Sequence, residues 1–194
     1  MSCYEIKKSG TIFTVGHFPW VKDYPATPVT KVTLSYNEEG FLVHFVSYET
    51  NLRATETAHN TPVHKDSCME IFMCFDPEHD GRYINVEINP NCAAYSAVSF
   101  CREQSRLIDP ADIDTLCIKS AVFDDRWELD YQIPVSYIQK QIPTYRHGPG
   151  ARLRGNFYKC GDETDHPHFG CFSDIAWPHP DFHRPEFFAD FVLV

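Results

Sequence analysis

A chain of 194 residues with a formal net charge of -10 is poorly suited to bind a polyanion, because it has only 17 lysines and arginines against 27 aspartates and glutamates. Nucleic-acid binding and attachment to anionic membranes both rely on basic patches, so both functions are disfavoured. A hydrophobic content of 43% suits a single globular domain, residues 1–194, with a full core.

The N-terminal sequence "MSCYEIKKSGTIFTVG" lacks the apolar run of a signal peptide. No other window reaches the roughly 18 apolar residues of a membrane span. We therefore expect a cytoplasmic protein. In a chain of this length without an export signal, the eight cysteines are expected to be reduced thiols, mostly small buried hydrophobic residues.

Short strands separated by turns are predicted along most of the chain. The segment 31–49, "KVTLSYNEEGFLVHFVSYE", has two alternating runs around a turn. Folding it about "NEEG" sets Val32 opposite Phe45. The same register sets Leu34 opposite Val43, which gives the hairpin one apolar face.

Later segments continue this pattern. Fourteen prolines interrupt the stretches long enough for a substantial helix, and residues 135–142 are the best candidate for a short one. The sequence predicts an all-β protein, an antiparallel, jelly-roll-like β-sandwich with one short helix. Further strands are expected at residues 68–75, 82–89, 93–100, 116–123, 127–133, 153–160 and 187–194.

The central hairpin places two acids opposite each other. Folding "SCMEIFMCFDPEHDGRYINVEINPN" about its turn pairs Glu70 with Glu87 and Phe72 with Asn85. Directly opposed side chains have Cβ atoms about 4.5–5.5 Å apart, and like charges so placed destabilise the pair.

Several features could compensate the charge repulsion between Glu70 and Glu87. They are a bound cation, a shared proton, the hydroxyl groups of a sugar, and Arg152 or Arg154 from a neighbouring strand. Alternatively, both acids lie on a solvated face and need no compensation.

The stretch "PHPDFHRPEFF", residues 178–188, is predicted to be a stiff loop, because its prolines cannot donate to a β-ladder. Its Phe182, and Trp177 just before it, either offer rings to a ligand or anchor the loop by packing. Arg184 either folds back to a carboxylate such as Glu70 or pairs locally with Glu186.

Metal sites are also considered. The segment 159–171, "KCGDETDHPHFGC", contains two cysteines and two histidines, but their spacing matches no zinc pattern. The acid-rich loops 76–81 and 108–114 offer clustered oxygen ligands, which favours structural calcium over zinc, and no other cofactor is indicated.

Four motifs occur in the order found in one family. "HKDSCMEIF", "YINVEINPN", "RGNFYKCGDE" and "PDFHRPEFF" resemble the motifs of family 9 carbohydrate-binding modules and their bacterial stand-alone relatives, from about residue 5 to the C-terminus. The resemblance implies a β-sandwich. It also implies non-catalytic binding of a terminal sugar or short oligosaccharide between two aromatic rings, with a glutamate and amides as hydrogen-bond partners and calcium at separate structural sites.

The resemblance can be carried over residue by residue. Glu70 matches the glutamate after the Asp-Ser pair, and Phe182 lies where the xylanase-linked members have a tryptophan. His64 stands where relatives usually have the other tryptophan, and Trp177 could supply the missing ring. The expected ligand-binding residues are Glu70, Phe182, Trp177, His64, Asn85, Glu87, Asn156 and Arg184.

The family context links such binding to the catabolism of polysaccharides such as xylan or of oligosaccharides, with a separate glycoside hydrolase as candidate partner. One alternative is an enzyme in which Glu70 and Glu87 act as acid and nucleophile of a glycosidase, since retaining chemistry needs carboxyls about 5–5.5 Å apart. No other catalytic motif supports it. A second alternative is a protein-interaction module that docks through its aromatic loop.

Overall fold

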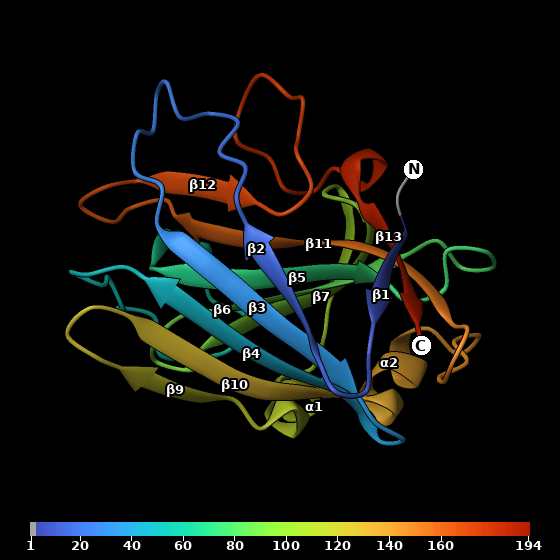
Figure 1. Cartoon of the computed structure of the whole chain (residues 1–194). Helices are drawn as coiled ribbons and strands as arrows, with labels where there is room; N and C mark the ends of the chain where they lie inside the picture. The colour runs from blue at the N-terminus through green and yellow to red at the C-terminus, as the bar shows by residue number, and fades with distance from the viewer. Residues whose placement is uncertain (1–2) are drawn as a thin grey trace.

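The computed structural model describes residues 3–194, which form two β-sheets packed face to face as a sandwich (Figure 1). In the described chain all strand pairs are antiparallel except β1–β13. The larger sheet has the order β1 (Cys3–Ile6), β13 (Ala189–Leu193), β11 (Arg152–Gly161), β5 (Cys68–Cys74), β6 (Tyr83–Ile88), β7 (Ala94–Cys101) and β8 (Gln104–Leu107), and β12 (His168–Cys171) pairs with β11. The smaller sheet has the order β2 (Thr11–Val15), β3 (Val29–Tyr36), β4 (Gly40–Tyr48), β10 (Trp127–Pro134) and β9 (Lys119–Val122).

Helical structure in residues 3–194 is limited to short segments. The predicted helix is confirmed as α2 (Val135–Gln141), and a single further α-helical turn forms α1 (Pro110–Ile113). Asp109 caps α1 by accepting a hydrogen bond of 2.9 Å from the Ala111 N–H, as expected of an N-cap aspartate followed by proline. Within these residues we find no helix with the length and apolar character needed to cross a membrane.

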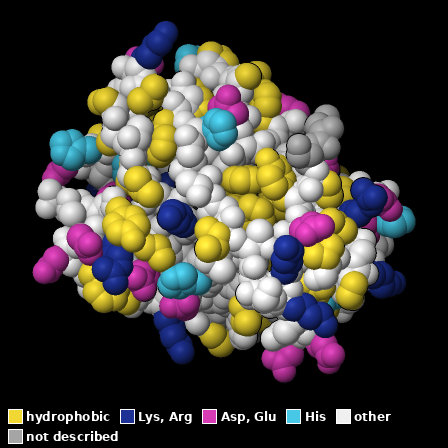
Figure 2. Space-filling model, viewed as in Figure 1, with side chains coloured by type: hydrophobic (Ala, Val, Ile, Leu, Met, Phe, Trp, Pro, Cys, Tyr) yellow, Lys and Arg dark blue, Asp and Glu magenta, His cyan; other side chains and the backbone are white. Residues whose placement is uncertain are grey.

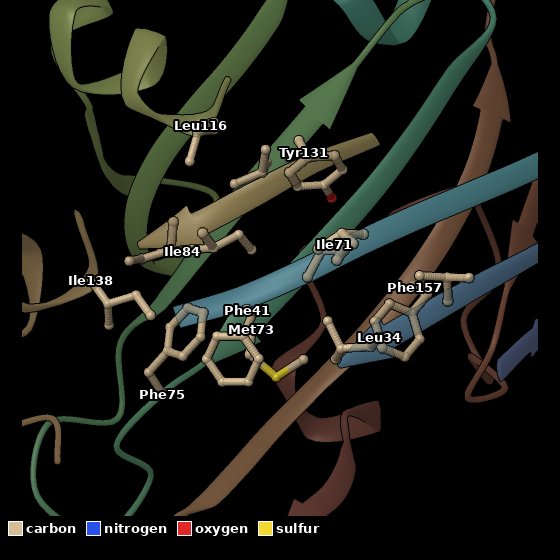
Figure 3. Close-up of a cluster of buried hydrophobic side chains, with 14 of the residues drawn as sticks. Leu34, Phe41, Ile71, Met73, Phe75, Ile84, Leu116, Tyr131, Ile138 and Phe157 are labelled. Atoms are coloured by element: carbon tan, nitrogen blue, oxygen red, sulfur yellow. The ribbon is translucent and has the colours of Figure 1, made fainter. Parts of the chain in front are cut away.

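The main core lies between the two sheets and follows the predicted alternation. The 31–49 hairpin has the expected register, with Val32 opposite Phe45 and Leu34 opposite Val43. Leu34 and Phe41 of the smaller sheet point toward Ile71, Met73 and Phe157 of the larger one (Figure 3). Full burial of each such side chain contributes about 1.5–3 kcal/mol, so this layer is the main source of stability.

The outer faces of the two sheets differ. The smaller sheet exposes one face, on which acidic, basic and hydrophobic side chains are interspersed (Figure 2). In contrast, every residue of β5 and β6 is buried, so both faces of these strands are covered.

Two long connections cover the outer face of β5, β6 and β11. Residues 16–28 follow β2 and residues 172–188 follow β12, and both stand at the upper side of the sandwich in Figure 1. The Trp20 indole N–H of the first donates to the Trp177 carbonyl of the second at 2.7 Å. Trp20 and Phe182 belong to a second hydrophobic cluster on this outer face, separate from the main core. The two connections therefore enclose part of the outer face of the larger sheet.

Candidate ligand-binding site

A cavity of about 630 Å³ lies over the outer face of β5 and β6. Its floor includes Glu70 on β5 and Glu87 on β6, and Cys160 at the end of β11. Its walls come from the 60–64 segment and from residues of the 177–183 loop. The floor is rigid because its side chains project from hydrogen-bonded strands, whereas the walls depend on loops.

Glu70 and Glu87 are cross-strand partners, as predicted from the sequence. The exposed fractions of the two residues are 2% and 4%, so the alternative of a solvated face is wrong. The Cys160 Sγ donates to Glu70 Oε1 at 2.9 Å, and Asn85 Nδ2 donates to Glu87 Oε1 at 2.9 Å. The pair therefore occupies the cavity floor with ordered neighbours.

The two arginines considered as partners for this pair lie elsewhere. Arg154 forms an ion pair with Asp190 at 3.3 Å. Arg152 is exposed at the start of β11, far along the strand from Cys160. Burial raises the pKa of Glu70 to about 7. Burial and the nearby charge of Glu70 raise the pKa of Glu87 well above its usual range. At neutral pH the pair holds at least one proton, so it offers hydrogen-bond donors as well as acceptors.

Phe182 both packs and lines the cavity. Its ring stacks on Tyr158, with centroids 4.1 Å apart and an interplanar angle of 4°. Only 8% of Phe182 is exposed, yet the ring forms part of the cavity wall. The sequence left two roles open for this residue, ligand platform and packing anchor, and its position is compatible with both.

Trp177 is the more exposed aromatic of the loop, with 39% of its surface accessible. It lines the cavity, and the Arg184 guanidinium lies 3.4 Å from its ring centroid. Arg184 also pairs with Asp181 at 2.7 Å and lies 3.8 Å from Glu186. Arg184 thus pairs locally and supports the Trp177 ring, and the expectation that it folds back to Glu70 is wrong.

His64 stands at the side of the cavity in a 3-10 turn, Val63–Lys65. Its Nδ1 lies 4.0 Å from Glu87 Oε2, and 43% of its side chain is exposed. Burial, followed by the positive charge of Arg102, lowers its pKa. The imidazole is therefore neutral at pH 7 and can present an uncharged ring to a ligand.

Asn85 and Asn156 do not line the cavity. Asn85 is next to Glu87 on the same face of β6 and orients its carboxyl group through the hydrogen bond given above. Asn156 Oδ1 accepts hydrogen bonds from the backbone N–H groups of Phe157, Phe172 and Ser173, and its amide donates to the Ser173 carbonyl. These bonds hold the start of the 172–188 connection against β11. In this structure both amides therefore bond to neighbouring protein groups outside the cavity lining.

Sequence reasoning missed several residues that the fold brings to the cavity. Arg102 follows β7 and donates to Asp181 at 2.8 Å across the cavity wall. Asp162 lies just after β11, and burial raises its pKa to about 6. Tyr95 of β7 is also part of the wall. Asp162 lies in the motif "RGNFYKCGDE" and Tyr95 is opposite Glu87 on the next strand, so the sequence offered signals for both. The contact of Arg102 with Asp181 joins distant segments and has no local signal.

In the acid-rich loops considered for calcium, most carboxylates pair with other groups of the protein. In the 76–81 turn, Asp76 pairs with His79 at 2.8 Å and Asp80 pairs with Arg82 at 2.6 Å. In the 108–114 segment the acids cap α1 or pair with basic side chains. A calcium ion needs several free oxygen ligands, so binding at either loop would require some of these pairs to break, although Asp76 Oδ2 accepts no hydrogen bond from residues 3–194.

His183 also lines the cavity and is neutral at pH 7. Its Nδ1 lies 2.8 Å from the Tyr83 hydroxyl. Burial lowers its pKa to about 4, and the positive charge of Arg102 adds to this effect, while Asp181 and Glu103 oppose it. His64 acts weakly in the same direction as Arg102.

This environment predicts a loss of stability in acid. Between pH 6.5 and about 4 the unfolded chain protonates His183 while the folded protein does not, so the free energy of unfolding falls as pH decreases through this window. The loss is at most about 3–4 kcal/mol, since each pKa unit corresponds to roughly 1.4 kcal/mol. Urea unfolding at pH 7 and pH 4.5 should show a smaller difference for His183→Gln than for the wild type. Equal differences would contradict the assignment.

The two sheets and the covered cavity define a β-sandwich module with a candidate binding site on the outer face of its larger sheet. The family model of Carbohydrate-binding family 9 matches residues 6–193, and the chain belongs to this family. No curated protein matches it.

Solved structures share the fold. A protein from Bacteroides uniformis ATCC 8492 to which carbohydrate binding is ascribed is 25% identical, with a TM-score of 0.83 over 100% of this chain and 98% of its own. A family 9 module from Caldicellulosiruptor kristjanssonii in complex with cellotriose is 12% identical, with a TM-score of 0.64 over 99% of this chain and 93% of its own. Its complex with glucose gives 14% identity and a TM-score of 0.64, over 100% and 96% of the two chains. The two Caldicellulosiruptor matches show that this chain shares their fold.

Proposed function

We propose that the protein binds carbohydrate without catalysis, taking a terminal sugar or a short oligosaccharide into the cavity over β5 and β6. The observation that carries the proposal is the buried Glu70–Glu87 pair on the floor of a cavity walled by aromatic rings. Membership of Carbohydrate-binding family 9 supports it. So do the structures of related fold that contain cellotriose and glucose.

The chemistry of the cavity suits a sugar. Neighbouring hydroxyls of a pyranose can donate to an ionised carboxylate and accept from a protonated one, and Glu70 and Glu87 supply both states at neutral pH. The apolar face of the ring can pack on Trp177, Phe182 or the neutral His64. Strand-borne acids and loop-borne rings thus give hydrogen bonds and stacking within one cavity.

The charges of the cavity favour a neutral sugar over an acidic one. Four carboxyl groups, those of Glu70, Glu87, Asp162 and Asp181, line it. The arginine in the lining, Arg102, is already paired with Asp181. A uronic acid would bring a further negative charge into this environment without a free cationic partner, which is costly in a desolvated site.

Isothermal titration calorimetry with glucose, cellotriose, xylobiose and glucuronic acid tests the proposal. We expect binding of at least one neutral sugar and weaker or undetectable binding of glucuronic acid. Absence of heat for every neutral sugar at millimolar concentrations would contradict carbohydrate binding. Preference for glucuronic acid would contradict the charge argument.

His64 provides a graded test of the stacking role. A tryptophan at this position has a larger ring than imidazole, and a well-placed aromatic contact contributes about 0.5–1.5 kcal/mol. We expect His64→Trp to raise the affinity for a bound sugar by about two- to tenfold and His64→Ala to lower it, both measured by calorimetry. Exposed His179, elsewhere in the cavity lining, is the matched control, and His179→Ala should have a smaller effect. Unchanged affinity in both His64 variants would place the sugar away from this wall.

We further propose that the ligand is a product or intermediate of polysaccharide or oligosaccharide catabolism, released by a separate glycoside hydrolase. Family membership supports this role. Tighter binding of short oligosaccharides with free ends than of the intact polymer, in the same calorimetric series, would agree with it. Tighter binding of the polymer would contradict it.

A further inference from the structure

We propose that Cys68, Glu70 and Cys160 form a site for a thiophilic divalent cation such as Zn²⁺ at the floor of the cavity. Their ligand atoms all lie within 4.8 Å of one another, and all three residues are buried. The inference goes beyond carbohydrate binding and does not require it, since the three side chains belong to the sheet itself.

Strand geometry brings the three groups together. Cys68 and Cys160 are directly opposite on the adjacent antiparallel strands β5 and β11. Glu70 follows Cys68 by two residues on the same strand, so both side chains point to the same face. The Cys160 Sγ is already 2.9 Å from Glu70 Oε1. No loop rearrangement is needed to collect these ligands.

The donor set selects a soft or borderline metal. Zinc takes thiolate sulfur at about 2.3 Å and carboxylate oxygen at about 2.0–2.2 Å in a tetrahedral arrangement, which sets its ligand atoms roughly 3.3–3.8 Å apart. The 4.8 Å that encloses the three atoms here accommodates this with small side-chain movements. Calcium and magnesium prefer oxygen ligands alone, so two sulfur donors disfavour them. On binding, the thiols release their protons to solvent.

Access and charge also favour a cation. Glu70 and Cys160 line the cavity, which gives an ion a path to the cluster. Within residues 3–194, neither floor carboxyl forms an ion pair with a lysine or arginine, and the group nearest to Glu87 is the neutral His64 imidazole, with Nδ1 4.0 Å from Glu87 Oε2. Lys159, next in sequence to Cys160, binds Glu49 at 2.9 Å and His168 at 2.8 Å instead. A divalent ion would therefore supply the positive charge that no lysine or arginine provides beside Glu70 and Glu87.

Cobalt titration of the reduced, EDTA-treated full chain, without sugar, tests the site. Co²⁺ replaces Zn²⁺ in such sites and gives an absorption band when thiolates bind it. We expect the band to saturate at one equivalent and to disappear when Zn²⁺ is added. The double variant Cys68→Ser/Cys160→Ser should lose the band. Cys74→Ser removes a buried thiol six residues further along β5 and should retain it.

The Glu70→Gln variant tests the site even if the double variant fails to fold, because it keeps both thiols and the shape of the Glu70 side chain. We expect its cobalt affinity to fall at least tenfold. A wild-type chain without a band would overturn the proposal. So would a band that survives the double substitution, because the ion would then be on the more exposed Cys3, Cys92, Cys101 or Cys117.

The metal site and the sugar site can fail separately. Cys68 does not line the cavity, so Cys68→Ala should lose cobalt binding and keep sugar binding measured in EDTA. A missing cobalt band with intact sugar binding defeats the metal site alone. A cobalt band without binding of any sugar defeats the carbohydrate proposal alone.

Discussion

Replacement of Glu70 by glutamine is expected to weaken sugar binding by about ten- to a hundredfold, while the free energy of unfolding stays level or rises. A hydrogen bond to a charged group contributes about 1.5–3 kcal/mol, and every 1.4 kcal/mol is a factor of ten in affinity. Stability should not fall, because the substitution removes an acid that opposes Glu87 on the adjacent strand. The amide oxygen of glutamine can still accept from the Cys160 thiol.

Calorimetry and urea unfolding in EDTA measure the two effects on the same samples. Glu128→Gln is the matched control: Glu128 lies on β10 of the other sheet and pairs with Arg126 at 2.7 Å. It should change neither affinity nor stability by more than about 1 kcal/mol, as is usual for partly exposed ion pairs. Unchanged affinity in Glu70→Gln would remove this residue from the sugar site. A large loss of stability would show a structural role instead.

The sequence predicted the floor of the site well, because local patterns determine it. Alternation of side chains on two strands joined by a short turn leaves few registers, so the pairing of Glu70 with Glu87 follows directly. The positions of the prolines, which interrupt the other long stretches, located α2. The one-turn helix α1 was missed although its Asp109-Pro110 start was a recognisable capping signal. The predicted strand 116–123 is shorter, β9 covering Lys119–Val122.

The family resemblance pointed to the wall residues His64, Trp177 and Phe182, but local patterns could not predict the contacts that hold the walls in place. Trp20 and Trp177 are 157 residues apart in sequence, yet their hydrogen bond joins the two connections that bury the outer sheet face. Arg184 had two candidate partners in the sequence, and its ion pair with Asp181 depends on the path of the loop. Burial of the floor acids, and hence their raised pKa values, results from these long-range contacts.

Asp66, in the Asp-Ser pair of the family motif, holds the segment that carries one wall. Its buried carboxylate accepts from the Thr55 hydroxyl and N–H and from the Glu56 N–H, each at 2.9 Å. Asn89 Nδ2 donates to it at 2.8 Å, and Arg53 forms an ion pair with it. Burial acts to raise the pKa of Asp66, but the donors from Glu56, Asn89 and Thr55 hold it below its usual value.

Asp66→Ala is therefore expected to lower the free energy of unfolding by about 3–5 kcal/mol, because it leaves several buried donors and a cation unpaired. Urea unfolding measures the loss, and Asp130→Ala is the control. Asp130 accepts from His44 at 2.9 Å but its side chain is 63% exposed, so its loss should cost less than about 1 kcal/mol.

The same substitution should weaken sugar binding although Asp66 does not line the cavity. The Val63–Lys65 turn that presents His64 ends at Asp66, whose N–H closes the turn on the Val63 carbonyl at 3.0 Å. Without the carboxylate anchor the turn gains freedom, and the entropy of ordering it must be recovered from the ligand. Asp66→Asn, which keeps one acceptor oxygen, should lie between wild type and alanine in both measurements. If alanine lowers stability but leaves sugar affinity unchanged, the 60–64 wall is held by packing and the motif aspartate serves the fold alone.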